Sequence, residues 1–184
     1  MMYPALMETV THYITGGMVM AKNFFRIDDR LIHGQIVTAW CGHLQIGEII
    51  AIDDKLAANK KLQSIMLMGI PAQYKAHVGT SAEAKALCAE ESPKNRLFVT
   101  RFPQDLANYR QELKSCDLVV IGNAAKRPDT KYNLTKGGGS VFFASDADGD
   151  LLDEIAADGV NLVYQTVPKS PAKTWQEMRK LVKR

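Results

Sequence analysis

The sequence has little cysteine and no long hydrophobic run, and these two absences exclude whole classes of protein. There are three cysteines, Cys41, Cys88 and Cys116, an odd number without a close pair. Each lies in an apolar pattern, which favours buried free thiols over a disulfide framework or a zinc site. No segment reaches the roughly 18 consecutive apolar residues of a transmembrane helix. We therefore expect a chain without disulfides, metal or a membrane span.

The sequence also has little net charge, +3 over 184 residues, and its basic residues are scattered apart from the C-terminal MRKLVKR. This pattern argues against a nucleic-acid partner. The composition, 46% hydrophobic and 23% charged, is that of an ordinary globular chain. A chain of this length fits one domain that buries roughly 70% of the surface of its unfolded form.

The first 20 residues stand apart from this globular pattern. They lack the basic segment and the small-residue cleavage site of a secretory signal. We interpret residues 1–20 as an N-terminal leader or flexible arm, and residues 21–184 as the folded domain.

Short apolar runs alternate with helical patterns through the rest of the chain, which is typical of βαβ units. We expect a single-domain α/β fold with a mostly parallel central sheet and helices on both faces. One long loop is expected at 124–140. The predicted strands are 21–28, 47–53, 74–78, 96–100, 117–123, 141–145 and 160–167, and the predicted helices are 34–45, 54–69, 80–91, 103–115, 146–157 and 173–183.

The stretch FRIDDRLIHGQIVTAW, residues 25–40, collects charged residues where the first strand ends and the first helix begins. In parallel sheets, ligands bind outside the carboxyl ends of the strands, at a topological switch point. The position alone makes this loop the leading site candidate. Its polar members are Arg26, Asp28, Asp29, Arg30, His33 and Gln35, with Gly34 opening the helix.

The chemistry of this loop suits an anion. The first backbone N–H groups of the helix favour an anion, and Gly34 allows backbone to approach closely. Arg30 suits the oxygens of a phosphate, while Asp28 and Asp29 suit roles in holding Arg30 or His33 and in capping the helix. His33 has a ring nitrogen able to act as a nucleophile, so phosphoryl transfer is one reading. A helix cap with a solvated surface histidine is the other.

RIDDRLIHGQIVTAW closely resembles the signature at the start of the IIB component of the mannose/fructose/sorbose family of the bacterial sugar phosphotransferase system. EIIAIDDKLA, residues 48–57, extends the similarity. VVIGN (119–123) and GVNLVYQTVP (159–168) continue it weakly, so that it covers roughly residues 21–182.

The resemblance implies a phosphohistidine carrier. His33 matches the histidine phosphorylated on Nδ1, which receives phosphate from a histidine of the IIA component. The phosphate passes to a sugar entering through the membrane components IIC and IID. Arg30 matches the phosphoryl-binding arginine and Asp28 its acidic neighbour; Arg26, Gly34 and Gln35 match flanking motif positions assigned to phosphate binding. The implied protein needs no cofactor, is cytoplasmic at the inner face of the membrane, and is often a dimer.

Other features carry weaker hypotheses. After the fifth strand the family continues with Gly-Gly-Met or Gly-Asn-Met, whereas here Gly122-Asn123-Ala124 leads into an unusual loop. That loop makes a second function conceivable, a non-catalytic phosphate- or partner-binding regulatory module. The sequence lacks the G-x-G-x-x-G and Walker motifs, which argues against a nucleotide-binding domain. Asp53 is expected to cap a helix, with support of the IIA-docking surface as the alternative. Gly137–Gly139 are expected to form a flexible turn in preference to a phosphate cradle. A basic loop is formed by Lys126, Arg127, Lys131 and Lys136.

Overall fold

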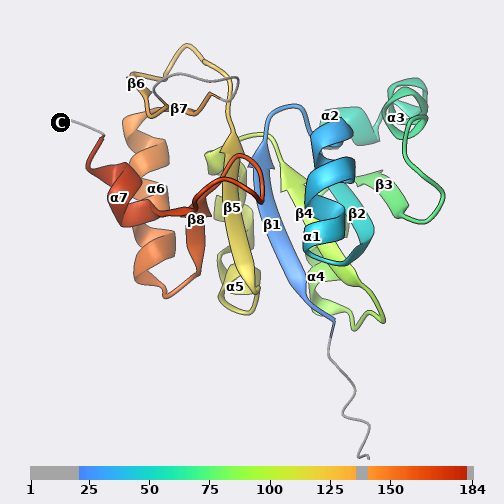
Figure 1. The fold of residues 1–184 in the computed structure, drawn as a ribbon. Helices are drawn as coiled ribbons and strands as arrows, with labels where there is room; N and C mark the ends of the chain where they lie inside the picture. Colours follow the sequence, from blue (N-terminus) through green and yellow to red (C-terminus); the bar gives the residue numbers. More distant parts are fainter. Residues whose placement is uncertain (1–20, 136–140, 182–184) are drawn as a thin grey trace, which may run out of the picture.

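The computed structural model describes residues 21–135 and 141–181 and shows the predicted α/β architecture (Figure 1). A seven-stranded sheet has the order β3-β2-β4-β1-β5-β8-β9, and every neighbouring pair is parallel except β8 and β9. Its strands are β1 (Asn23–Asp28), β2 (Ile46–Ile52), β3 (Lys75–Gly79), β4 (Asn95–Thr100), β5 (Leu118–Asn123), β8 (Leu162–Tyr164) and β9 (Lys173–Thr174).

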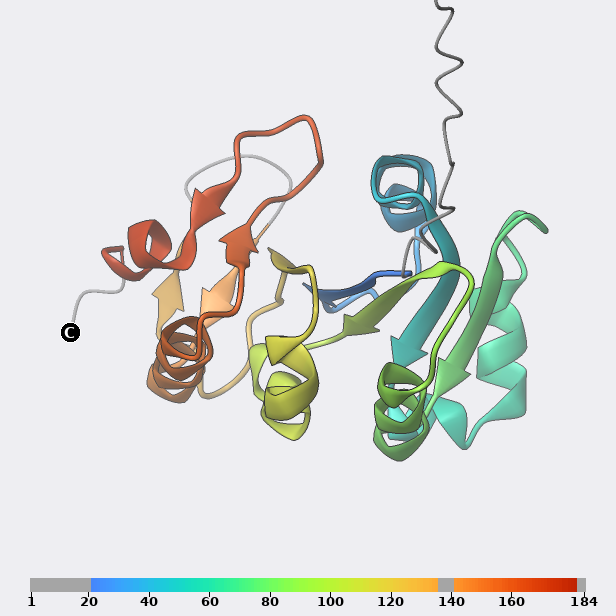
Figure 2. The same cartoon turned by 90° about the horizontal axis from the view of Figure 1, so that it is seen from below.

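Helices cover both faces of the sheet, as predicted (Figure 2). The central strands are near-continuous apolar runs because both of their faces are buried. Phe25 and Ile27 of β1 point into one core and Phe24 into the other. The first core is covered by α4 (Ser81–Ala89), α5 (Arg110–Lys114) and α6 (Asp146–Ala157), and the second by the helix that follows β1, composed of η1 (Ile36–Trp40) and α1 (Cys41–His43).

The predicted helix 54–69 is wrong in one respect, because it is two helices. α2 (Asp54–Ala57) ends at Ala58, and Asn59 caps a new helix, α3 (Lys60–Leu67), through the backbone N–H of Leu62. Asn favours such caps because its side chain satisfies an N–H group that lacks an intrahelical partner. Ile65 and Met68, two large apolar residues of this segment, are exposed.

The C-terminal third also departs from the prediction. The strand expected at 160–167 is the three-residue β8, and Lys173–Thr174, predicted to be helical, pair antiparallel with it as β9 before α7 (Trp175–Arg179). The strand expected at 141–145 is only β7 (Phe143–Ala144), which pairs with β6 (Tyr132–Asn133) outside the main sheet. The helix predicted at 146–157 is confirmed, and Ser145 caps it.

The end of β1 lies at a topological switch point of the sheet. This strand lies between β4 and β5. The helix after β1 packs on one core, whereas η2 (Pro103–Tyr109), which follows β4, packs on the other. Neighbouring strands whose helices leave to opposite faces form a topological switch point.

Within the described residues, no helix is long and apolar enough to cross a membrane.

Candidate functional site

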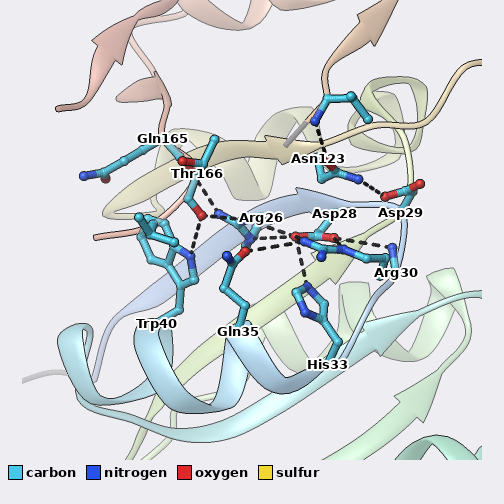
Figure 3. Close-up of polar contacts among 12 residues, drawn as sticks. Arg26, Asp28, Asp29, Arg30, His33, Gln35, Trp40, Asn123, Gln165 and Thr166 are labelled. Carbon is cyan, nitrogen blue, oxygen red and sulfur yellow. Dashed lines mark hydrogen bonds and ion pairs between the residues drawn. The ribbon is translucent and has the colours of Figure 1, made fainter. Parts of the chain in front are cut away.

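Asp28, the last residue of β1, is the centre of the site (Figure 3). Its carboxylate is fully buried and faces three cationic or titratable groups. One oxygen, Oδ2, lies 3.0 Å from Nη2 of Arg26 and 3.1 Å from Nε2 of His33. The other, Oδ1, lies 3.0 Å from Nε of Arg30. A buried carboxylate is tolerated because partners surround it in this way.

These partners keep Asp28 ionised. Burial by itself raises the pKa of a carboxyl group, but the contacts from His33 and Arg30 and the charge of Arg26 lower the pKa of Asp28 to about 2. Asp28 is therefore a fixed negative charge at neutral pH, and it faces the edge of the imidazole ring of His33.

The depressed pKa of Asp28 gives a testable dependence of stability on pH. An Asp with a pKa of 3.8 in the unfolded chain and about 2 in the fold stabilises the fold above pH 3.8. We expect this contribution, about 2 kcal/mol, to be lost as the pH falls from about 4 to about 2. Urea unfolding of the chain and of its Asp28→Asn variant, compared at several pH values, measures it. The gap between the two free energies of unfolding should narrow across this window, and a gap that stays constant would contradict the assignment.

Arg26 is enclosed beneath Asp28. Its guanidinium donates to the Asp28 carboxylate and to the backbone oxygens of Gln165, at 3.2 Å, and Thr166, at 3.3 Å. It also lies over the ring of Trp40, with its Cζ 4.7 Å from the ring centroid, and the indole Nε1 of Trp40 donates to the same Thr166 oxygen. Only 1% of Arg26 is exposed, so its contacts are to the protein itself.

Gly122 provides the space for this guanidinium. The pairing of β1 with β5 shifts register between Ile27 and Asp28, so that Asp28 lies opposite Asn123 and Gly122 falls in a bulge. A Cβ at Gly122 would come closer than 3.0 Å to guanidinium atoms of Arg26. Glycine here allows the close approach of a side chain to the backbone, a common reason for glycine in a strand.

We expect Gly122→Ala to push Arg26 out of this position. Overpacking of a buried site costs about 1–3 kcal/mol, and Asp28 would lose part of its support as well. Urea unfolding should show this decrease. Gly42→Ala is the control because a Cβ at Gly42 meets no atom within 4 Å. Equal stability of the two variants would show that the contact between Gly122 and Arg26 carries no strain.

Arg30 is the exposed arm of the site, with 45% of its side chain accessible. Its Nε and Nη2 donate to Asp28, and Nη2 also lies 3.4 Å from Oε1 of Gln35. Its Nη1 has no hydrogen bond to any residue in the described part of the chain. The guanidinium is thus anchored on one side and open to an incoming anion on the other.

His33 lies beside this arm at the start of the helix, and its backbone oxygen accepts the N–H of Val37. Its side chain is 18% exposed. Nε2 faces Asp28 without the alignment of a true hydrogen bond, so the contact is electrostatic. The negative charge of the Asp28 carboxylate next to Nε2 favours the imidazole tautomer that carries its proton on Nε2, which leaves a lone pair on Nδ1. No described residue forms a hydrogen bond with Nδ1.

The backbone between Asp28 and His33 is strained. The backbone N–H of Leu31 donates to the backbone oxygen of Asp28 at 2.9 Å. Leu31 adopts a φ of 55°, a left-handed conformation. Such a conformation costs of order 1–3 kcal/mol in a residue other than glycine and persists only where its surroundings enforce it. Leu31 and Ile32 are buried, and their packing helps to hold the turn.

The family model for the sorbose subfamily IIB component of the phosphotransferase system matches residues 22–184. The chain belongs to this family. It is 40% identical over 157 residues to the mannose-specific EIIAB component of Escherichia coli K12, covering 83% of this chain and 46% of that protein. It is 26% identical to the sorbose-specific EIIB component of Klebsiella pneumoniae over 149 residues, covering 80% of this chain and 88% of that protein. The chain thus spans about half the length of its mannose-specific relative.

Solved structures share the fold. The IIB domain of the sorbose permease of Klebsiella pneumoniae superimposes with a TM-score of 0.73 at 25% identity, covering 88% of this chain and 98% of that domain. A phosphotransferase-system-dependent N-acetylgalactosamine IIB component from Streptococcus pyogenes gives a TM-score of 0.70 at 22% identity, covering 84% of this chain and 96% of that chain. The family and the α/β fold with a mostly parallel central sheet, both predicted from the sequence, are confirmed.

The structure brings most of the predicted site residues together. Asp28, Arg30 and His33 form one cluster, and Gln35 reaches Arg30. Gly34 lies at the exposed start of the helix, and a Cβ there would meet open space, so close approach of the protein's own backbone does not require this glycine. Arg26 is buried behind Asp28. The roles of Arg30, Gly34 and Gln35 in phosphate binding stay predictions.

Several residues of the site escaped the sequence reasoning. The backbone oxygens of Gln165 and Thr166, Gly122, Asn123 and Arg101 all contact the loop or its supports. The signal for Arg101 and Asn123 was present, since each polar residue lies where a predicted strand ends. Backbone acceptors leave no signal in the residue type.

The expected basic loop is largely neutralised. Arg127 pairs with the buried Asp148 and with Asp129, and Lys131 pairs with Asp146. Lys126 is exposed, while Lys136 and Gly137–Gly139 lie outside the described residues. The expectation for Asp53 is confirmed, because its side chain accepts the N–H of Leu56 and caps α2.

Proposed function

We propose that this chain is a phosphoryl carrier of a sugar phosphotransferase system, with His33 as the residue that carries the phosphoryl group. It accepts the group from a phosphohistidine of a IIA component. It then passes the group to a sugar that enters through membrane components of the IIC and IID type, at the inner face of the membrane. One observation carries the proposal: Nε2 of His33 faces the buried Asp28, no described residue bonds Nδ1, and Arg30 binds the same carboxylate while its Nη1 has no described partner.

The first step forms one bond and breaks one. The Nδ1 lone pair of His33 attacks the phosphorus of the donor, the new N–P bond forms, and the N–P bond of the donor breaks, leaving its electron pair on the donor imidazole. Phosphoryl transfer asks a protein mainly for positioning and for stabilisation of charge. Arg30 supplies a cation with free N–H groups toward the transferring oxygens, and it is already oriented by Asp28 and Gln35.

In the second step Nδ1 of His33 is the leaving atom. A sugar hydroxyl oxygen attacks the phosphorus, the bond from Nδ1 breaks, and the hydroxyl proton is released to a base or to solvent. A proton held on Nε2 makes the phosphorylated ring cationic, and a cationic imidazole is the better leaving group. Asp28 stabilises that cation without itself taking up a proton, since its pKa is about 2.

The buried members of the site have a supporting role in this proposal. Arg26 has no access to an incoming phosphate, because its guanidinium is enclosed by Asp28, Trp40 and backbone oxygens. We propose that it holds the Asp28 carboxylate in position and keeps it ionised. The first backbone N–H groups of the helix, at Gly34 and Gln35, add a favourable partial charge toward the phosphoryl group.

The test is to locate the phosphoryl group. The full chain is incubated with phosphoenolpyruvate, the general proteins of a phosphotransferase system and a IIA component, and ³¹P and ¹⁵N NMR then identify the modified atom. We expect an acid-labile phosphoryl group on Nδ1 of His33. Phosphate bound near Arg30 without transfer to His33 would instead indicate a non-catalytic binding module on the same fold.

A further inference from the structure

Asp29, the residue between Asp28 and Arg30, is clamped from both sides. Its backbone N–H donates to the backbone oxygen of Asn123 at 3.1 Å, and its carboxylate accepts a hydrogen bond from the Asn123 side-chain amide. Figure 3 shows the contact between the Asp29 carboxylate and Asn123. The backbone oxygen of Asp29 accepts a hydrogen bond from Nη1 of Arg101. All three polar groups of Asp29 are therefore engaged.

The sheet order makes this clamp. β1 lies between β4 and β5, so the residues that end or follow these two strands flank the loop after β1. The bulge at Gly122 advances β5 by one residue and sets Asn123 opposite Asp28. Bulges re-aim side chains in this way and occur next to active sites.

Both clamping side chains are themselves held. Oδ1 of Asn123 accepts the N–H of Val141 at 2.8 Å, which fixes the amide so that its nitrogen faces Asp29. Nε of Arg101 donates to Asp53, the residue that caps α2. The loop after β1 is thereby tied to three other elements of the fold.

We propose that Asn123 and Arg101 are positioning residues that act through Asp29 to hold Arg30 and His33 in their reactive arrangement. Asp29 lies within the turn from Asp28 to Leu31, whose left-handed residue needs external support. Rotation of this turn would move Arg30 relative to His33. The inference rests on the proposed function for its effect on transfer, but the clamp can also be measured in the free chain.

A reversal of donor and acceptor tests the clamp. Asn123→Asp sets two carboxylates against each other. Asp29→Asn alone keeps the bond, because the oxygen of the new amide accepts from Asn123. The double variant restores the bond with its polarity reversed, since the new amide donates to the new carboxylate while the second carboxylate oxygen still accepts from Val141.

Phosphoramidate, a small phosphoryl donor for imidazoles, reports transfer without a protein partner. We expect Asn123→Asp to slow phosphorylation of His33 by about tenfold to a hundredfold, in kcat more than in KM, as a misplaced reacting group does. The double variant should recover to within about threefold of Asp29→Asn, as two directly coupled residues do. Equal rates for Asn123→Asp and the unaltered chain, or no recovery in the double variant, would overturn the proposal.

The pH profile separates positioning from a general loss of structure. Two facing carboxylates share a proton, which raises the pKa of one of them. The protonated form restores the hydrogen bond, so the rate of Asn123→Asp relative to the unaltered chain should rise as the pH falls from 8 toward 6. A merely destabilised variant would show no such recovery.

Matched controls lie outside the clamp, because Asn95 begins β4 at the strand end opposite Arg101 and Arg110 begins the helix α5. Asn95→Asp removes an amide that donates to the Leu44 oxygen, and Arg110→Gln removes pairs with Glu154 and Asp158. Arg101→Gln should slow transfer, while neither control should. Side-chain ¹⁵N shifts of His33 and Arg30 in the free chain judge the clamp separately. These shifts should change in Asn123→Asp and return in the double variant, whether or not the chain takes up a phosphoryl group. If the shifts behave in this way but the unaltered chain takes up no phosphoryl group, the proposed function is refuted and the clamp is not.

Discussion

His33→Ala should take up no phosphoryl group from the donor cascade, whereas the unaltered chain becomes labelled. The reason is chemical: the imidazole is the nucleophile of the proposed reaction, and alanine offers no atom to which phosphorus can bond. His33→Gln should be equally inactive, although glutamine keeps a donor that can face Asp28. Acid-labile incorporation of ³²P, measured under the same conditions for each variant, gives the result.

The fold should survive this change, so that the loss reports chemistry. His33 is one of three partners of Asp28, and Arg26 and Arg30 remain. We expect the free energy of unfolding to change by less than about 2 kcal/mol. His43→Ala is the matched control, because His43 lies on the same helical segment, is exposed, and should leave labelling intact. Labelling of His33→Ala at the rate of the unaltered chain would refute the assignment of His33.

Asp28→Asn should damage both stability and transfer. It leaves Arg26 buried with its charge uncompensated, and breaking a buried pair in this way costs about 3–5 kcal/mol. It also removes the charge that favours the proton on Nε2 of His33. Loss of a carboxylate that orients a catalytic imidazole lowers turnover by as much as about 10⁴-fold in the well-studied serine protease case. We expect the transfer rate at saturating donor to fall by at least about 10²-fold, on the same reasoning.

Urea unfolding and single-turnover labelling separate the two effects, provided that labelling is done where the variant is folded. Asp117→Asn is the control because Asp117 is a partly exposed carboxylate paired with Lys22. Surface pairs of this kind contribute about 0–1 kcal/mol, and we expect no change in transfer. If Asp28→Asn has the same free energy of unfolding and the same transfer rate as Asp117→Asn, Asp28 is not the centre of the site.

The order of strands and helices along the chain was predictable because it depends on local patterns. Apolar runs bounded by turn residues marked β1, β2, β4 and β5 to within about two residues, the usual precision for element boundaries. The errors arose where long-range pairing outweighed local preference. Lys173–Thr174 became a strand because β8 offers a free edge, and the helix expected at 54–69 broke where Asn59 competes as a cap.

The residues of the candidate site divide in the same way. Asp28, Arg30 and His33 are five positions apart at most, and the strand–loop–helix pattern already placed them at one sheet edge. Asn123 ends β5 and Arg101 follows β4, both far away in the sequence, and only the sheet order brings them to Asp29. Arg26 shows a further limit, since its sequence position beside the motif does not reveal that the 165–166 backbone and Trp40 enclose it.

The sequence by itself determined the fold class, because strand and helix periodicity is a property of neighbouring residues. It also determined the family, through the resemblance of residues 26–40 to a family signature, and it placed the candidate site there. Only the tertiary structure decided which groups neutralise Asp28, which nitrogen of His33 has no partner among the described residues, and what holds the turn between them. Those outcomes depend on contacts among β1, β4, β5 and the segment after β8. The free energy of such contacts comes from burial and charge pairing across long loops, which no local pattern records.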